Sequence, residues 1–160
     1  MLCDLNMIVI FGKYHCLVLM ESDKSLVFEG YWKDDLYMVD FSTGPQMAVC
    51  LLAKASEWII DSGCTNHMTG KRSLLMDSTL RPSDKSHITF ADTGKSKVLG
   101  LGRVAISKDQ HMDRVMLVES LGYNLMSVSM LCDLDMIVIF GKYRCRVLMA
   151  SDKSLVFEGY

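Results

Sequence analysis

Residues 130–160, MLCDLDMIVIFGKYRCRVLMASDKSLVFEGY, determine our expectation for the fold, because short apolar runs alternate in them with turn residues. The run MIVIF is separated from RCRVLM by a segment that begins with Gly141 and Lys142, which is a turn signal between two strands. The same 31-residue segment occurs at residues 1–31 with changes at only four positions. The chain therefore contains one hairpin-forming segment twice, at an offset of 129 residues.

The four substitutions indicate how this segment lies in a sheet. They replace Asn6, His15, Leu17 and Glu21 of the first copy by Asp135, Arg144, Arg146 and Ala150 of the second. Arg144 and Arg146 alternate with the unchanged apolar Cys145 and Val147. Because successive residues of a strand point to opposite faces, this pattern predicts a half-buried β-strand.

The rest of the chain has further β-branched and aromatic runs between turn residues. We expect strands at residues 57–61, 87–91, 97–101, 103–107, 114–119, 136–140, 144–149 and 155–158. Many short strands at close spacing predict an all-β barrel or sandwich. A solenoid is disfavoured, because stacked repeats recur roughly every 20–50 residues in three or more copies.

Two segments carry weaker signals. Residues 124–133, NLMSVSMLCD, predict one short helix with Asn124 as its N-cap. Residues 47–56, MAVCLLAKAS, fit either a short helix or a buried strand.

The repeat also divides the chain into three parts. We predict a duplicated β segment at residues 1–31, a linker at residues 32–56 and a β-barrel domain at residues 57–160. Because an unpaired sheet edge recruits other strands, we expect residues 1–31 to pair with the edge of the barrel sheet or to exchange between protomers.

Composition limits the class of protein. The chain has 160 residues, half of them hydrophobic, and 17 basic against 19 acidic side chains, which is the composition of about one globular domain and disfavours a basic nucleic-acid-binding module. The longest stretches without charge run to 13 residues, short of the roughly 18 that a membrane helix needs. Residues 1–11 contain Asp4 and no basic residue, unlike a secretory signal. We therefore expect a reducing, cytoplasmic compartment and no membrane partner.

The cysteines do not form a metal-binding pattern. None of the six lies at CxxC spacing, and Cys64 with His67 makes only one C-x-x-H half-site. A closed zinc site needs four ligands. We therefore expect reduced, buried thiols, no metal, no cofactor, and no catalytic role for His67.

The stretch with a chemical signature is WIIDSGCTNHMTG, residues 58–70. A strand over residues 58–60 would deliver the carboxylate of Asp61 into a buried site, with Ser62 beside it and Gly63 allowing a close turn. Two such carboxylates close together cannot both ionise, so they share a proton, and such a pair can activate water and protonate a substrate. Asp-Ser-Gly is also ordinary turn chemistry, which stays an open alternative.

The wider text resembles the protease region of Copia-type LTR retrotransposon Pol polyproteins, especially those of plants. Three segments carry the resemblance: WIIDSGCTNHMTG, HITFADTGKSKVLGLGRVAI (87–106) and VMLVESLGYNLMSVSMLCDL (115–134). Residues 37–56, YMVDFSTGPQMAVCLLAKAS, resemble the lead into the pre-integrase region. The resemblance would make the chain an out-of-phase tandem fragment, which agrees with the repeat.

The resemblance implies an aspartic endopeptidase with a small retropepsin-like β-barrel and one short helix, active as a homodimer on peptide or polyprotein substrates. Asp61 would be the catalytic carboxylate, Ser62 its hydroxyl partner and Gly63 the tight-turn residue. The segment 88–106 would supply a flap hairpin over the peptide. Residues 125–128 would be the second motif behind the catalytic loop, with Ser127 where many retroviral-type enzymes have Gly.

Two other functions remain as alternatives. The first is a catalytically silent β-barrel remnant of a transposon, with at most a protein-interaction role, and the duplication and phase shift favour it. The second is a metal- or nucleic-acid-binding module, which the single C-x-x-H half-site and the net charge of −2 disfavour.

Overall fold

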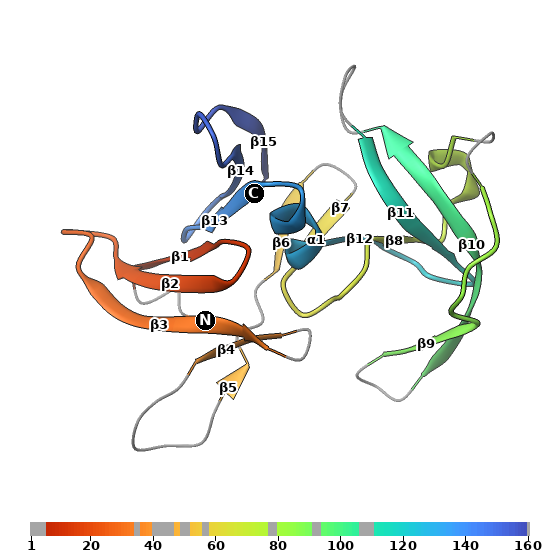
Figure 1. Cartoon of the computed structure of the whole chain (residues 1–160), viewed down its shortest axis with the longest axis horizontal. Helices are drawn as coiled ribbons and strands as arrows, with labels where there is room; N and C mark the ends of the chain where they lie inside the picture. The colour runs from red at the N-terminus through yellow and green to blue at the C-terminus, as the bar shows by residue number, and fades with distance from the viewer. Residues whose placement is uncertain are drawn as a thin grey trace. The chain divides into compact units, whose positions relative to one another are not determined.

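A computed structural model describes residues 6–33, 36–39, 47–48, 52–55, 58–76, 80–90, 94–105 and 111–159 (Figure 1). These residues are mainly β-strands, with a single α-helix, α1 (Val128–Asp133), and a short 3-10 turn, η2 (Arg72–Leu74). The predicted all-β class with one short helix is therefore confirmed. The chain forms two compact units, Met1–Thr65 with Ser127–Tyr160 as the first and Asn66–Met126 as the second.

The first unit contains an eight-stranded sheet in the order β15-β14-β13-β1-β2-β3-β4-β5. Its strands are β1 (Met7–Phe11), β2 (His15–Met20), β3 (Leu26–Lys33), β4 (Leu36–Val39), β5 (Met47–Ala48), β13 (Met136–Phe140), β14 (Cys145–Met149) and β15 (Leu155–Gly159). An antiparallel pair, β6 (Leu52–Ala55) with β7 (Trp58–Asp61), belongs to the same unit. The two copies of the repeat thus lie in one sheet.

Each copy folds into the same three-stranded meander, β1–β3 in the first and β13–β15 in the second. Val9, Phe11, Cys16 and Val18 are fully buried in the first copy, and Val138, Phe140, Cys145 and Val147 are buried in the second. Outward positions such as Arg146 are exposed. The predicted half-buried strand is therefore confirmed.

The same turn closes the second hairpin of both copies. In the first copy Ser25 donates from its amide and its hydroxyl to the carboxylate of Asp23, at 3.0 and 2.7 Å, and Asp152 accepts the same two bonds from Ser154 in the second. These bonds lower the pKa of both aspartates. The identical sequence therefore encodes its turn locally.

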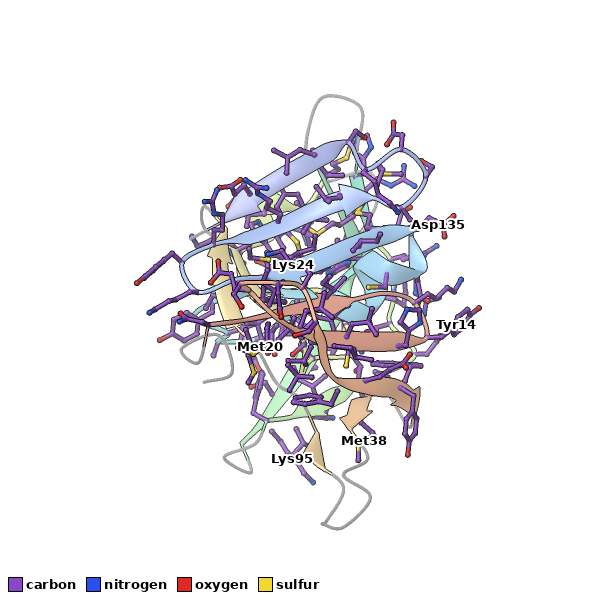
Figure 2. The ribbon with its side chains drawn as sticks, turned by 90° about the vertical axis from the view of Figure 1, so that its left-hand side faces the viewer. Tyr14, Met20, Lys24, Met38, Lys95 and Asp135 are labelled. Carbon is purple, nitrogen blue, oxygen red and sulfur yellow. The ribbon has the colours of Figure 1, made fainter. Side chains whose placement is uncertain are left out.

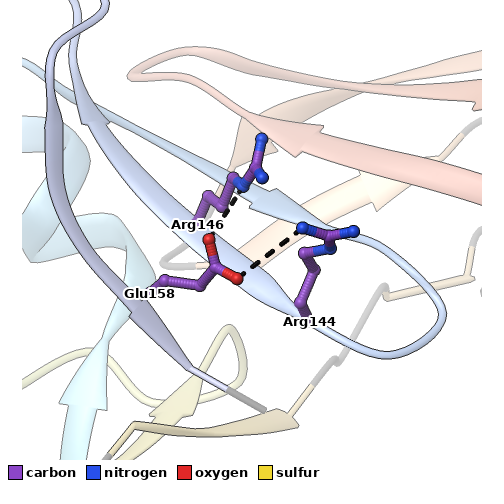
Figure 3. A network of polar contacts seen from close by, with 3 residues as sticks. All are labelled: Arg144, Arg146 and Glu158. Carbon is purple, nitrogen blue, oxygen red and sulfur yellow. Dashed lines mark hydrogen bonds and ion pairs between the residues drawn. The ribbon is translucent and has the colours of Figure 1, made fainter.

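The two arginines that distinguish the second copy lie near the edge of the sheet (Figure 3). Arg146 donates from Nε to Glu158 at 3.0 Å, and a guanidinium nitrogen of Arg144 lies 3.8 Å from the other carboxylate oxygen. The first copy places Leu17 opposite Glu29 at the corresponding position. Exposed pairs of this kind contribute at most about 1 kcal/mol, so their effect is mainly to add charge beside edge strand β15.

The second unit has its strands in the order β12-β8-β11-β10-β9. Their bounds are β8 (Met68–Thr69), β9 (His87–Thr89), β10 (Lys95–Ala105), β11 (His111–Val118) and β12 (Asn124–Ser127), of which the last residue, Ser127, already belongs to the first unit. The long β10–β11 hairpin is antiparallel, whereas β8 pairs with β11 in parallel. Apolar side chains of β10 and β11, among them Val98, Val115 and Val118, form its core.

Strand β10 corrects the prediction of separate strands at 97–101 and 103–107. It runs unbroken from Lys95 to Ala105, with register shifts on both sides of its Gly-x-Gly. A Cβ on Gly100 would lie 2.9 Å from the carbonyl oxygen of Arg81, and one on Gly102 would lie 3.0 Å from Leu75. The glycines therefore allow close packing within a bulged strand and do not end it. Residues 106 and 107 lie outside the described part of the chain.

The prediction of a helix over 124–133 with an Asn124 cap is wrong in its first half. Residues 124–127 form β12, and α1 begins at Val128 with Ser127 as its N-cap. Asn124 instead accepts a buried hydrogen bond from the hydroxyl of Thr69 at 2.6 Å. Of residues 47–56, those that the structure describes form two strands, β5 and β6, and not a helix. Residues 49–51 and 56 lie outside the described part of the chain.

Candidate active site around Asp61

Strand β7 carries Asp61 to the start of a tight loop. It pairs antiparallel with β6, with Asp61 opposite Leu52. Ile60 is fully buried, Asp61 is half-buried, and Ser62 is 2% exposed. Two β-branched residues followed by a turn triplet thus produce the predicted arrangement, a strand that ends in a carboxylate. Glu57, the first residue of the predicted strand, lies outside the described residues.

The loop itself is organised around the carboxylate. The amide of Gly63 donates to Oδ1 of Asp61 at 2.7 Å, which is the Asx-type turn expected of this triplet. The thiol of Cys64 donates to the carbonyl oxygen of Asp61 at 3.4 Å. The three predicted site residues, Asp61, Ser62 and Gly63, therefore form one compact loop in which one carboxylate oxygen has a fixed direction.

Ser127 anchors this loop from a distant point in the sequence. Its hydroxyl donates to the carbonyl oxygen of Cys64 at 2.7 Å and accepts from the amide of Met130 at 3.4 Å. The hydroxyl of Ser129 lies 2.9 Å away from it. Because Ser127 is fully buried, a single side chain caps α1 and ties the helix to the Asp61 loop.

Sequence reasoning missed this role. The sequence predicts residues 125–128 behind the loop, and the Ser127–Cys64 hydrogen bond confirms that proximity for Ser127. The available signal was a Ser directly before the apolar run of a short helix, which is a typical N-cap. Asn124 gives the same signal three residues earlier, but it lies in β12 and caps no helix.

The segment predicted as a flap, 88–106, contributes to a hairpin of the second unit. Thr89 pairs with Lys95 and Ile88 with Ser96, and the amide of Phe90 donates to the carbonyl of Gly94 at 2.9 Å. The tip residues 91–93 and Ile106 lie outside the described residues. The hairpin exists as an element, and its closing over a peptide stays a prediction.

His67 is a buried histidine of the second unit. It is fully buried, and this burial lowers the pKa of its imidazole from 6.5 to about 4, so that the ring is neutral at pH 7. In the part of the chain that the structure describes, no group of three or more His, Cys, Asp or Glu side chains is placed to hold a metal ion.

The described cysteines Cys16, Cys64, Cys132 and Cys145 are buried free thiols. Burial raises the pKa of Cys16 to about 11. Among the described helical residues, no helix is long and apolar enough to cross a membrane.

Comparison with known proteins places this loop in a family. The family model described as Pol polyprotein, beta-barrel domain matches residues 58–136, from the first residue of β7 to the first residue of β13. This segment is a Pol polyprotein β-barrel domain. Asp61, Ser62, Gly63 and Ser127 all lie inside the Pol polyprotein β-barrel domain, and the first copy of the repeat lies outside it.

A curated relative supports the same assignment. The putative transposon Ty5-1 protein of Saccharomyces cerevisiae is 38% identical over 90 residues, which cover 52% of this chain and 60% of the relative. The match thus spans less than two thirds of that protein. No solved structure matches the chain. The predicted origin in a Pol polyprotein region of an LTR retrotransposon is confirmed.

Proposed function

We propose that this chain is an aspartic endopeptidase of the Copia type, which hydrolyses peptide bonds of a polyprotein with one Asp61 from each subunit of a homodimer. The observation that carries the proposal is the loop that β7 delivers. The carboxylate of Asp61 accepts a hydrogen bond from the Gly63 amide, and the buried N-cap of α1, Ser127, holds the loop by donating to the Cys64 carbonyl oxygen. This loop lies within a Pol polyprotein β-barrel domain.

The chemistry needs two carboxylates. One Asp61 would take a proton from a water molecule as that water attacks the peptide carbonyl carbon, and the other would donate the shared proton to the substrate. Neither carboxylate forms a covalent bond to the substrate. Because close carboxylates titrate as a pair, cleavage is expected to require mildly acidic conditions in which the pair holds one proton.

The neighbours of Asp61 would act as positioning residues. The Gly63 amide fixes one carboxylate oxygen, and the buried Ser62 hydroxyl would lie beside the dyad.

The β9–β10 hairpin would close over an extended peptide. Its outward residues His87, Thr89, Lys95 and Lys97 are exposed in the described structure.

Cleavage of an unfolded protein substrate tests the proposal. The purified chain, Asp61→Asn and the control Asp84→Asn are compared across roughly pH 4–7, the range in which a proton-sharing pair acts. Asp84 is an exposed carboxylate of the second unit. Loss of cleavage in Asp61→Asn alone is the expected result. Equal cleavage by all three chains would assign the activity to a contaminant or to other residues and refute the proposal.

A silent transposon remnant is the second candidate, and one observation favours it. The first copy of the repeat is built into the sheet of the second through β1 and β13, so that the duplicated segment has become part of the structure. This candidate predicts no cleavage by any of the three chains while circular dichroism shows folded β-structure.

A further inference from the structure

The two copies of the repeat meet through equivalent strands. β1 pairs antiparallel with β13, and the partners are Val9 with Phe140, Ile10 with Ile139 and Phe11 with Val138. At the offset of 129 residues Val9 corresponds to Val138, and Phe11 to Phe140. Exchanging the two strands therefore leaves the set of paired residues unchanged. Figure 2 shows the orange-red strands of the first copy beside the blue strands of the second.

A local two-fold axis thus passes between Ile10 and Ile139. Both strands have the sequence MIVIF, and none of the four substitutions falls in them. On the buried side the rings of Phe11 and Phe140 meet edge to face, with their centroids 5.7 Å apart and their planes at 85°. Val9 and Val138, which are equivalent, are both fully buried.

The backbone follows the same symmetry. The amide of Gly12 donates to the carbonyl of His15 at 2.9 Å, and the amide of Gly141 donates to that of Arg144 at 2.8 Å. Antiparallel pairs alternate between hydrogen-bonded and non-bonded positions. Bonded positions recur at every second residue, so the backbone groups of Ile10 and Ile139 form hydrogen bonds within their own hairpins. The amide of Val9 therefore faces the other copy.

The outer face of the junction repeats this relation. A pocket of about 280 Å³ is lined by Ile8, Ile139 and Gly141 among others, and a second, of about 330 Å³, by the equivalent Ile137, Ile10 and Gly12. The junction therefore has the self-complementary form of an isologous contact between two identical chains.

We infer that the side of β13 that pairs with β1 is a self-pairing surface, whose partner is a second copy of the same strand. Within this chain β1 is that copy, and its covalent tether gives it a high effective concentration, so that it occupies the edge first. When β1 is displaced, β13 of one chain pairs with β13 of another, centred on Ile139. This inference goes beyond the proposed protease function and does not depend on it.

Cysteine cross-linking in the full chain tests the inference. In a pair of β13 strands two Ile139→Cys residues would face each other at a non-bonded position, about 4.5 Å apart between Cα atoms, which suits a disulfide. Val9→Pro removes the amide that β1 turns toward β13 and is used to displace β1. The control reporter is Ile137→Cys, which shares the outer face but lies two residues from the axis.

The expected results are specific. Val9→Pro with Ile139→Cys should double in mass and form an interchain disulfide, and the same chain with Ile137→Cys should form none. Adding Val138→Pro should return the single-chain mass. In the otherwise unchanged sequence, Ile10→Cys with Ile139→Cys should cross-link within one chain.

Three outcomes would overturn the inference. A second displacing variant, Ile10→Glu, keeps every backbone amide and places a charge opposite Ile139, so it serves if the proline variant loses its fold. Displaced chains that are folded and monomeric would show that β13 does not pair with itself. If both variants lose their β-structure by circular dichroism, or if Ile10→Cys fails to link to Ile139→Cys, β1 is not an exchangeable partner.

Discussion

Replacing Ser127 by alanine should loosen the Asp61 loop and destabilise the first unit together. The substitution removes the donor of the 2.7 Å bond to the Cys64 carbonyl and the acceptor of the Met130 amide. A buried carbonyl that loses its donor costs about 1–3 kcal/mol. Loss of an N-cap costs about 0.5–2 kcal/mol, and the long 3.4 Å cap bond places it at the low end of that range.

Together these losses predict that Ser127→Ala lowers the free energy of unfolding by about 2–3 kcal/mol, or the Tm by about 5–10 °C for a chain of this size. Ser127→Gly separates the two contributions, because glycine is a tolerated cap that costs only a few tenths of a kcal/mol. It should therefore lose mainly the Cys64 bond. Ser129→Ala, which loses only a hydroxyl–hydroxyl contact of 2.9 Å, should cost less than about 1 kcal/mol.

Urea denaturation at constant m-value measures these differences. If the endopeptidase proposal holds, Ser127→Ala should also cleave more slowly than Ser129→Ala under conditions in which both are folded. A loss below about 0.5 kcal/mol for Ser127→Ala, the range of ordinary surface substitutions, would refute the reasoning that this hydroxyl ties α1 to the loop.

Three further predictions concern single residues. A Cβ on Gly70 would lie 2.1 Å from the carbonyl oxygen of Leu121, so Gly70→Ala should lose at least about 2 kcal/mol in urea denaturation, while Gly122→Ala, with open space, should stay within about 0.5 kcal/mol. The lowered pKa of His67, about 4, means that the unfolded chain binds a proton below pH 6.5 that the folded chain rejects. The free energy of unfolding is therefore at its full value above pH 6.5 and should fall by about 3 kcal/mol toward pH 4. A free energy of unfolding that stays constant between pH 7 and 4.5, or a pH profile that His67→Leu leaves unchanged, would contradict this. The raised pKa of Cys16, about 11, predicts that iodoacetamide labels this thiol only in unfolded chains, as mass spectrometry of a partly denatured sample can check.

The strands of the second copy were predictable because their signals are local. Met136–Phe140 has the predicted bounds, and residues 145–149 and 155–159 differ from prediction by one residue at an end. Alternating apolar residues and side-chain-bonded turns fix such hairpins without help from distant residues. The Asp61 turn was predictable for the same reason, since the hydrogen bond from the Gly63 amide to the Asp61 carboxylate joins residues only two positions apart.

The errors fall where distant residues decide between local choices. Asn124 and Ser127 are both good N-caps, and the choice is made by Thr69, which lies 55 residues from Asn124 and holds it in a strand. The anchor of the candidate site has the same character, because Ser127 and Cys64 are 63 residues apart. No periodicity in one sequence encodes such a bond, so the positioning of the loop could be read only from the structure.

The arginines of the second copy follow from its position in the sheet. In the first copy the sheet continues from β3 to β4, so Leu17 of β2 lies in the interior of a wide sheet. In the second copy β15 is the edge strand, and the corresponding position on β14 is Arg146, paired with Glu158 of β15. Charge beside an edge strand discourages further strand addition, whereas the MIVIF strands β1 and β13, which pair with each other inside the sheet, are unchanged. Arg144 and Arg146 thus add charge beside the outer edge of the sheet, and the pairing strands of the β1–β13 junction keep an identical sequence.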